Sequence, residues 1–172
     1  DEANRLYVGQ ADLARRLTAA DAPAGELVVW DVGLGAATNA MAALRCFERC
    51  AAENAGRAVR PLRLVSFECD LDPLRLAAGK AGYFPHARHG APQAILQHGH
   101  WTHPSGAMRW ELWPGDFLVR LAGAPAPDLI FYDPFSFKTD AALWTPETFA
   151  KLRAACGAKP AELYTYSAAT AV

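Results

Sequence analysis

Val28-Val-Trp-Asp-Val-Gly-Leu-Gly-Ala-Ala-Thr-Asn39 is the stretch that decides the fold of this chain. Its apolar, β-branched run, which begins at Leu27 and reaches Asp31, predicts a buried strand. The run breaks at Gly33 and Gly35, and an Ala-, Leu- and Met-rich stretch with helical spacing follows. A strand, a glycine turn and the start of a helix let a backbone approach a ligand closely, with free N–H groups directed at it. The third glycine of the dinucleotide fingerprint is replaced by threonine, so the turn alone is a weak signal.

Length and composition indicate one globular domain. The chain has 172 residues, which can bury a substantial core, and its 52% apolar and 20% charged residues exclude disorder. The formal net charge of −1 does not indicate that the whole chain binds nucleic acid. Eight arginines nevertheless lie between Arg5 and Arg63, where they could form a locally basic face or simply a solvated surface.

The sequence shows neither a membrane span nor a secretory pattern. It contains no apolar run of the length that crosses a bilayer and no visible signal peptide, so we expect a cytoplasmic protein. The four cysteines, Cys46, Cys50, Cys69 and Cys156, lack the spacing of a disulfide framework. Cys46 and Cys50 lie one helical turn apart, but no second pair completes a metal site. We expect reduced cysteines that pack as small hydrophobic side chains.

Strands alternate with helices along the chain. We expect strands over residues 27–31, 63–67, 109–113, 128–133 and 162–166. We expect helices over residues 11–19, 38–54, 73–80, 116–121 and 145–156. The intervening stretch 83–106 is irregular, with a helix across 92–97. This alternation predicts an α/β fold, a doubly wound parallel sheet with helices on both faces.

Polar residues and glycines follow the expected strands where each strand ends. These strand-end residues are, in chain order, Asp31, Gly33, Gly35, Glu68, Asp116 and Asp133. Open α/β sheets bind ligands outside the carboxyl ends of their strands, so the residues should gather at one ligand site. Helix capping explains an acid such as Asp116 without any ligand. Together the residues match an adenosine-containing ligand. The glycines would admit its backbone-like part, one carboxylate would bind the two ribose hydroxyls, and another would accept a hydrogen bond from the exocyclic amine of adenine.

Two cofactor classes share this outline. A nicotinamide dinucleotide would need the third glycine and a ribose-binding acid about 20 residues after the turn. Glu68 instead follows Gly35 by 33 residues (68 − 35). S-adenosylmethionine carries no phosphate, so a G-x-G turn suffices. We therefore expect S-adenosylmethionine as the cofactor and methyl transfer as the reaction.

Phe131-Tyr-Asp-Pro-Phe-Ser-Phe-Lys-Thr-Asp-Ala-Ala-Leu-Trp-Thr145, followed by Glu147-Thr-Phe149, narrows the class further. This segment resembles the MnmC-type family of tRNA methyltransferases, which act on the wobble uridine. Other segments that are similar to the family are 6–16, 33–35 with Asn39, 65–68 and 163–169. Positions that depart from its pattern are Pro134, Phe137, Thr139 and Asp140.

The resemblance implies a Rossmann-like class I methyltransferase that methylates the aminomethyl nitrogen of a tRNA wobble uridine. Gly33 and Gly35 would border the methionine part of S-adenosylmethionine, Glu68 would bind the ribose hydroxyls and Asp116 the adenine amine. Asp133 would face both the cofactor and the incoming amine, whose N–H it would accept as a hydrogen bond.

Two further residues complete the expected cofactor site, Asp31 and Asn39. Phe135 is a candidate catalytic residue that would stack on the substrate or on the sulfonium, although a core position is the alternative. The resemblance also implies tRNA as a partner through its anticodon region, and a separate oxidase that prepares the substrate. We expect residues 1–172 to form a single methyltransferase domain that lacks the family's last hairpin. The alternatives are methylation of another amine, or a non-catalytic module that binds cofactor or RNA.

All five histidines lie between His86 and His103. Such a tract could bind a metal, border the substrate entrance or be exposed to solvent, and we assign no metal ligands because no acid or cysteine lies among them. Trp101, Trp110 and Trp113 could stack on unpaired RNA bases, with core packing as the alternative, above all for Trp113.

Overall fold

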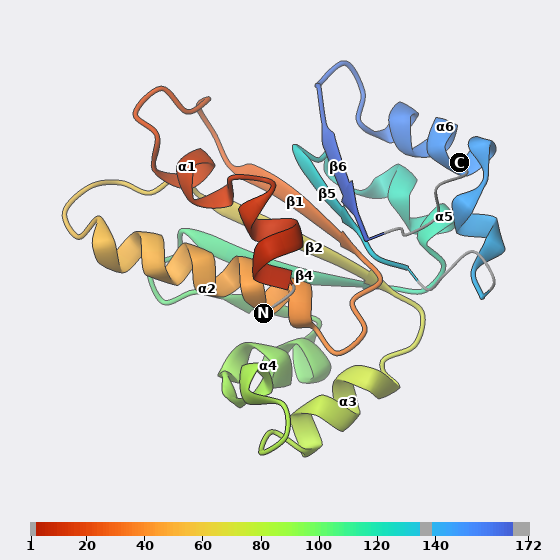
Figure 1. Cartoon of the computed structure of the whole chain (residues 1–172), viewed down its shortest axis with the longest axis horizontal. Coiled ribbons are helices and arrows are strands. Elements are labelled where there is room, and N and C mark those ends of the chain that lie inside the picture. Colours follow the sequence, from red (N-terminus) through yellow and green to blue (C-terminus); the bar gives the residue numbers. More distant parts are fainter. Residues whose placement is uncertain (1–2, 135–138, 167–172) are drawn as a thin grey trace.

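A six-stranded sheet with the order β3-β4-β2-β1-β5-β6 runs through the molecule (Figure 1). The computed structural model describes residues 3–134 and 139–166. The strands are β1 (Leu27–Val32), β2 (Leu62–Glu68), β3 (His100–Thr102), β4 (Met108–Pro114), β5 (Leu129–Tyr132) and β6 (Glu162–Thr165). Neighbouring strands are parallel except for β3, which pairs antiparallel with β4.

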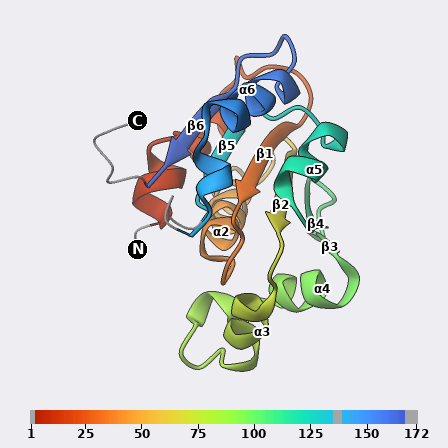
Figure 2. The ribbon, with the colours of Figure 1, turned by 90° about the vertical axis from the view of Figure 1, so that its right-hand side faces the viewer.

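Helices cover both faces of the sheet. The α-helices are α1 (Leu13–Thr18), α2 (Thr38–Glu53), α3 (Asp72–Gly79), α4 (Gly90–His98), α5 (Phe117–Arg120) and α6 (Pro146–Ala155). The shorter helical segments are the π-helix η1 (Asn4–Gly9) and the 3-10 helices η2 (Pro85–Arg88), η3 (Leu121–Gly123) and η4 (Ala141–Trp144). The N-terminal helices and α2 lie on one side of β1, and α5 lies on the other (Figure 2). Within the described part of the chain, no helix has the length and apolar character needed to cross a bilayer.

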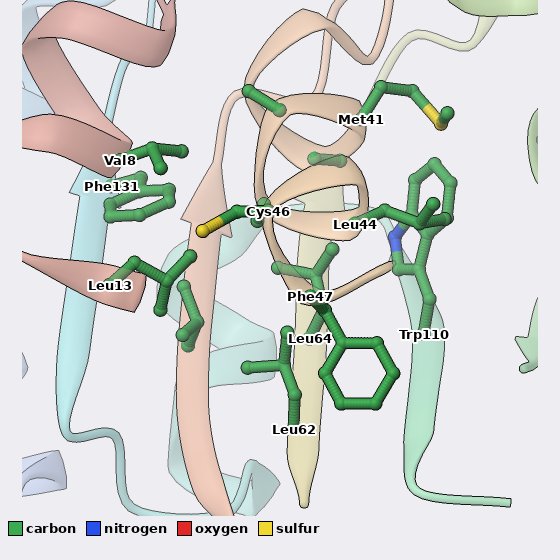
Figure 3. Close-up of a cluster of buried hydrophobic side chains, with 14 of the residues drawn as sticks. Val8, Leu13, Met41, Leu44, Cys46, Phe47, Leu62, Leu64, Trp110 and Phe131 are labelled. Carbon is green, nitrogen blue, oxygen red and sulfur yellow. The ribbon is translucent and has the colours of Figure 1, made fainter. Parts of the chain in front are cut away.

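Two apolar clusters hold these layers together, one on each face of the sheet. Successive residues of β1 alternate between them, so that Val29 joins the cluster under α2 while Val28 and Trp30 join the cluster under α5 and α6. Figure 3 shows the first cluster, in which side chains of α2 such as Phe47 pack over β2 and over Trp110 of β4. The period of two along each strand therefore decides which helix a side chain meets.

The expected doubly wound α/β fold is confirmed, with one correction to the purely parallel sheet. The stretch expected to be irregular contains β3, which runs antiparallel at the edge. Gly99 ends α4 with a φ of +74°, and Gly106 has a φ of +73° in the turn before β4. Both glycines allow the chain to reverse sharply, and β3 has only three residues, too few to show an alternating pattern.

The topology creates a crevice beside β1. The chain leaves β1 for β2 on one side, and it later returns to the other side of β1 as β5. Ligands of open α/β sheets bind where the strand order reverses in this way, outside the carboxyl ends of the strands. The predicted functional residues lie at these strand ends.

Candidate active site

A cavity of about 680 Å³ lies at the carboxyl ends of β1, β2, β4 and β5, within the ~300–1,000 Å³ range usual for ligand pockets. The predicted residues that line it are Gly33, Gly35, Asn39, Glu68, Asp116 and Asp133. The structure thus brings together residues that are up to 100 positions apart in sequence (133 − 33). Asp31 does not belong to the lining, and Phe135 lies outside the described residues.

The two glycines of the turn do different things. Gly33 has a φ of +87°, and a Cβ there would lie 2.4 Å from the backbone oxygen of Asp133. Only glycine therefore allows the ends of β1 and β5 to approach this closely. Gly35 has a φ of +51°, and a Cβ there would meet nothing within 4 Å. This second glycine keeps space free at the wall of the cavity.

Glu68 joins the glycine turn to the end of β2. Its Oε2 accepts a hydrogen bond from the Gly35 N–H at 2.9 Å. Its Oε1 accepts from the N–H groups of Cys69 at 2.8 Å and Asp70 at 3.0 Å. A carboxylate has about four acceptor positions, so these three bonds leave capacity for one ligand hydroxyl. Glu68 therefore has a structural role that the sequence did not predict, and its expected contact with a ligand stays a prediction.

Asp116 caps the short helix α5, because its Oδ1 accepts a hydrogen bond from the Leu118 N–H at 2.8 Å. The capping role weighed for this acid is therefore present. The residue also lines the cavity. Since the cap uses one carboxylate oxygen, capping and contact with a ligand are compatible.

Asp133 follows β5 directly, and its backbone N–H donates to the oxygen of Val32 at 2.9 Å. The side chain is exposed to the cavity, and its Oδ2 accepts a hydrogen bond from Asn39 Nδ2 at 2.8 Å. Asn39 is 7% exposed and lies in the first turn of α2. A buried amide thus orients a carboxylate that faces the cavity.

Asp31 lies beneath the cavity. It is fully buried, with Oδ2 accepting from Ser66 Oγ at 2.7 Å, while Trp110 Nε1 donates to the same Ser66 Oγ at 2.9 Å. Its Oδ1 has no hydrogen-bond partner among the described residues. Burial raises the pKa of Asp31 to about 7; the Ser66 hydrogen bond opposes this rise, and the charges of Asp133 and Glu68 add to it. Asp31 therefore does not line the cavity, but its charge interacts with those of Asp133 and Glu68, which do.

Tyr7 of η1 also lies near the site, although no sequence pattern predicts a role for it. The residue is 3% exposed, and its ring packs against Phe131 with centroids 5.3 Å apart. Burial raises the pKa of Tyr7, and the nearby Asp133 carboxylate raises it further. Its position within the segment that resembles the MnmC-type family is the signal that could have drawn attention to it.

The charge of the cavity distinguishes between cofactor classes. Its described lining carries five carboxylates and no lysine, arginine or histidine, the acids being Glu68, Asp70, Asp116, Asp133 and Asp140. Pyrophosphate groups would be repelled here, whereas a sulfonium and an ammonium group would be attracted. The described residues therefore fit S-adenosylmethionine, which has both cationic groups and no phosphate, better than a dinucleotide.

The cysteine prediction needs one correction. Cys46, Cys50 and Cys156 are free and buried, as expected of small hydrophobic side chains. Cys69 is free but exposed, and it lines the cavity. It follows the end of β2 directly, in the loop that Glu68 holds, and no core element covers it.

The histidines are dispersed among local partners. His86 Nε2 lies 2.8 Å from the oxygen of Ala36, a residue of the cavity wall, and His89 Nε2 lies 3.2 Å from Glu48 Oε1. In residues 3–134 and 139–166, no three His, Cys, Asp or Glu side chains gather as a metal site. Trp110 is fully buried, which agrees with core packing and prevents it from stacking on RNA.

Three comparisons relate the chain to known proteins. Among curated proteins, none matches the chain. A family model described as S-adenosyl-L-methionine-dependent methyltransferase matches residues 84–172, which is more than half of the chain. The solved structure of MnmC2 from Aquifex aeolicus has a TM-score of 0.62 and 17% identity, over 97% of this chain and 50% of that one.

Two other methyltransferase structures are more distant. A methyltransferase from Geobacter sulfurreducens has a TM-score of 0.46 and 18% identity, over 95% of this chain and 58% of that one. The rRNA methyltransferase AviRa from Streptomyces viridochromogenes has a TM-score of 0.45 and 19% identity, over 94% of this chain and 72% of that one.

These likenesses carry different weight. At 17% identity, the similarity to MnmC2 shows a shared fold, and this chain spans half of that protein's length. The family match shows more, because it is made on the sequence, and the acidic cavity at the strand ends fits its cofactor independently. The chain belongs to the S-adenosyl-L-methionine-dependent methyltransferase family.

Proposed function

We propose that this methyltransferase acts on the aminomethyl nitrogen of a tRNA wobble uridine. The observation that carries the proposal is the Asp133 carboxylate, which faces the cavity at the end of β5 and is oriented by Asn39. A positioned carboxylate suits an amine acceptor, which has N–H groups to donate and a proton to lose. The resemblance of segment 131–145 to the MnmC-type family and the fold shared with MnmC2 support the choice of tRNA.

The proposed cofactor contacts follow the lining of the cavity. Gly33 and Gly35 border the methionine part, Glu68 binds a ribose hydroxyl with its remaining acceptor position, and Asp116 accepts from the adenine amine. Asp31 contributes negative charge from below the cavity floor. S-adenosylmethionine supplies an electrophilic methyl group on a positively charged sulfur. The sulfur would leave as a neutral thioether, so no acid is needed to protonate the leaving group.

The chain's own task is to orient the acceptor and to remove a proton. Asp133 accepts an N–H hydrogen bond from the neutral amine, so that the nitrogen lone pair is directed at the methyl group. Correct orientation of two reactants can supply several kcal/mol of the barrier. Once nitrogen has gained the methyl group it is a cation, and Asp133 takes or relays the proton that it releases.

The proposal is tested by a methylation assay that uses methyl-labelled S-adenosylmethionine and tRNA whose wobble uridine carries an unmethylated aminomethyl group. We expect label on the wobble uridine. We expect Asp133→Ala to lower turnover by about 10³-fold or more, because both orientation and proton removal are lost, while the Kd for S-adenosylmethionine changes by less than about 5-fold. Calorimetric titration measures the second quantity.

Asp72→Asn is the matched control, since Asp72 is an exposed acid of α3 that pairs with Arg75 at 2.7 Å and does not line the cavity. It should keep normal turnover. Undiminished turnover in Asp133→Ala would refute the role of Asp133. Label on small amines but not on tRNA would favour the other acceptor class, and cofactor binding without transfer to any acceptor would favour a non-catalytic module.

A further inference from the structure

The Tyr7 hydroxyl is a buried polar group that the proposed function has not used. Tyr7 is 3% exposed, and its oxygen forms no hydrogen bond of normal geometry with a described residue. A buried hydroxyl without a partner costs free energy of roughly 1–3 kcal/mol, so such groups are uncommon unless they serve a function. The environment of this hydroxyl is therefore informative.

Asp133 is a charged neighbour of this hydroxyl. Phe131 and Asp133 are two residues apart along β5 and its extension, so their side chains lie on the same face of the sheet. The Tyr7 ring packs on Phe131 with centroids 5.3 Å apart, which places Tyr7 beside the face of β5 that also carries Asp133. Burial raises the pKa of Tyr7 most, and the charge of Asp133 raises it further. The hydroxyl therefore keeps its proton and can act as a hydrogen-bond donor.

Asn39 reaches the same carboxylate from α2. Its Nδ2 donates to Asp133 Oδ2 at 2.8 Å, so two elements far apart in sequence, η1 and α2, present donors to one carboxylate. A single hydrogen bond leaves a carboxylate free to rotate about its χ2 torsion, whereas two donors fix its plane. Catalytic hydrogen bonds are often long in the free enzyme and tighten when the substrate is bound.

We propose that Tyr7 is a positioning residue for Asp133, donating a hydrogen bond to the carboxylate and fixing, together with Asn39, the plane in which it receives the acceptor amine. This inference rests on the proposed role of Asp133 as the group that meets the amine. Tyr7 itself touches neither the amine nor the methyl group. Its effect is on the rate of methyl transfer and not on cofactor binding.

Steady-state kinetics of Tyr7→Phe test this role, because phenylalanine keeps the ring and its packing on Phe131 and removes only the hydroxyl. We expect kcat to fall by about 10- to 100-fold, since a misplaced catalytic group costs rate in this range. The KM for S-adenosylmethionine should change by less than about 2-fold. Unchanged kcat would overturn the proposal, and a rise in KM with constant kcat would assign Tyr7 to cofactor binding instead.

Tyr164→Phe is the matched control. Its hydroxyl donates to the Glu162 Oε2 at 2.6 Å on β6, so the variant removes the same kind of tyrosine–carboxylate bond outside the cavity lining. Kinetic constants should stay within about 2-fold of those of the unaltered protein. An equal loss of kcat in both variants would show that the effect in Tyr7→Phe is not specific to Asp133.

A second measurement separates this inference from the proposed function. Thermal unfolding of Tyr7→Phe, Asp133→Ala and the double variant needs no acceptor, and residues in contact give non-additive changes. We expect the change in Tm of the double variant to differ from the sum of the single changes. If the unaltered protein methylates no tRNA, the proposed acceptor is wrong, while non-additivity would still support the contact. Additive changes would overturn the positioning role whatever the acceptor.

Discussion

The Asp31 carboxyl group connects the stability of the protein to pH. It is fully buried, and burial raises its pKa from 3.8 to about 7. The folded state therefore binds this proton more tightly than the unfolded chain does, and its stabilising effect is complete below about pH 4. The effect is lost as pH rises through about 7. As pH rises from 4 to 8, we expect the deprotonation of this group to lower the free energy of unfolding by roughly 2–4 kcal/mol.

Urea unfolding at several pH values, with Asp31→Asn, measures this contribution. Asparagine retains an oxygen that can accept from Ser66 but does not titrate, so the variant should show a clearly smaller fall in stability with pH. Asp72→Asn removes an exposed acid and should keep the pH dependence of the unaltered protein. An equally steep fall in Asp31→Asn would mean that another group is responsible.

The same residue shows where prediction from sequence ends. The pattern correctly predicts acids and glycines at the strand ends, and most of them line one cavity. It does not predict the face on which each side chain lies. Asp31 shares the face of Leu27 and Val29, which is covered by α2 and η1, so it is buried and excluded from the cavity wall. The sequence did not predict the position of Tyr7, because it depends on how η1 packs against Phe131 of β5.

At the scale of elements, the close approach of β1 to β5 depends on Gly33. Alanine there would place a Cβ 2.4 Å from the Asp133 backbone oxygen, at a φ of +87°. We expect Gly33→Ala to lower the free energy of unfolding by about 2–4 kcal/mol, through strain and displacement of the β5 end. Turnover should fall as well, because Asp133 moves with that end. Chemical denaturation and the methylation assay measure the two effects.

Gly35→Ala is the informative counterpart. Its φ of +51° makes alanine cost about 1–2 kcal/mol, but the added Cβ meets no protein atom within 4 Å. The variant should therefore remain folded, while the Kd for S-adenosylmethionine rises about 10-fold or more because the methyl group occupies cavity space. Equal losses of stability in both glycine variants, with unchanged cofactor binding in Gly35→Ala, would contradict this division of roles.

Most elements could be predicted because their signals are local. The β-branched run of β1, the helix formers of α2 and the Thr145-Pro146 start of α6 each specify their own structure. β3 and η1 could not, for a physical reason. β3 is a three-residue edge strand that exists through its pairing with β4, and η1 is held by its contacts with α2 and β6. Such tertiary contacts have no periodic pattern in the sequence.

At the scale of the whole molecule, the arginines of the N-terminal part differ in whether an acidic side chain pairs with them. Several arginines of the N-terminal part are already neutralised, as Arg16 is by Glu162 at 2.6 Å and Arg63 is by Glu111 at 3.0 Å. Arg45 and Arg49 of α2 are different. Their side chains donate to neutral acceptors, Arg45 to the oxygen of Pro85 at 3.3 Å and Arg49 to the sulfur of Cys46 at 3.8 Å. Both are exposed and border a second hollow of about 420 Å³ between η1, α1 and α2.

If tRNA is the substrate, its backbone would extend along α2 to this hollow while one nucleotide enters the cavity. Arg45 and Arg49 follow Asn39 by 6 and 10 residues along α2 (45 − 39 and 49 − 39), a rise of about 9–15 Å at ~1.5 Å per residue. They are also four residues apart and so lie on one face of the helix. If tRNA is the substrate, we expect these two guanidinium groups to contact phosphates, and the acidic cavity to receive only the uncharged and cationic groups.

We therefore expect Arg45→Ala combined with Arg49→Ala to weaken tRNA binding about 10-fold near 0.1 M salt. The slope of log K against log salt concentration should shrink by about 1–2, because each lost phosphate contact removes nearly one released counterion. The Kd for S-adenosylmethionine should not change, since neither residue lines its cavity. Arg153→Ala is the control, an exposed arginine on α6 across the sheet that should leave the slope intact. Fluorescence anisotropy at several salt concentrations measures the slopes; an equal change in both proteins would place the RNA elsewhere.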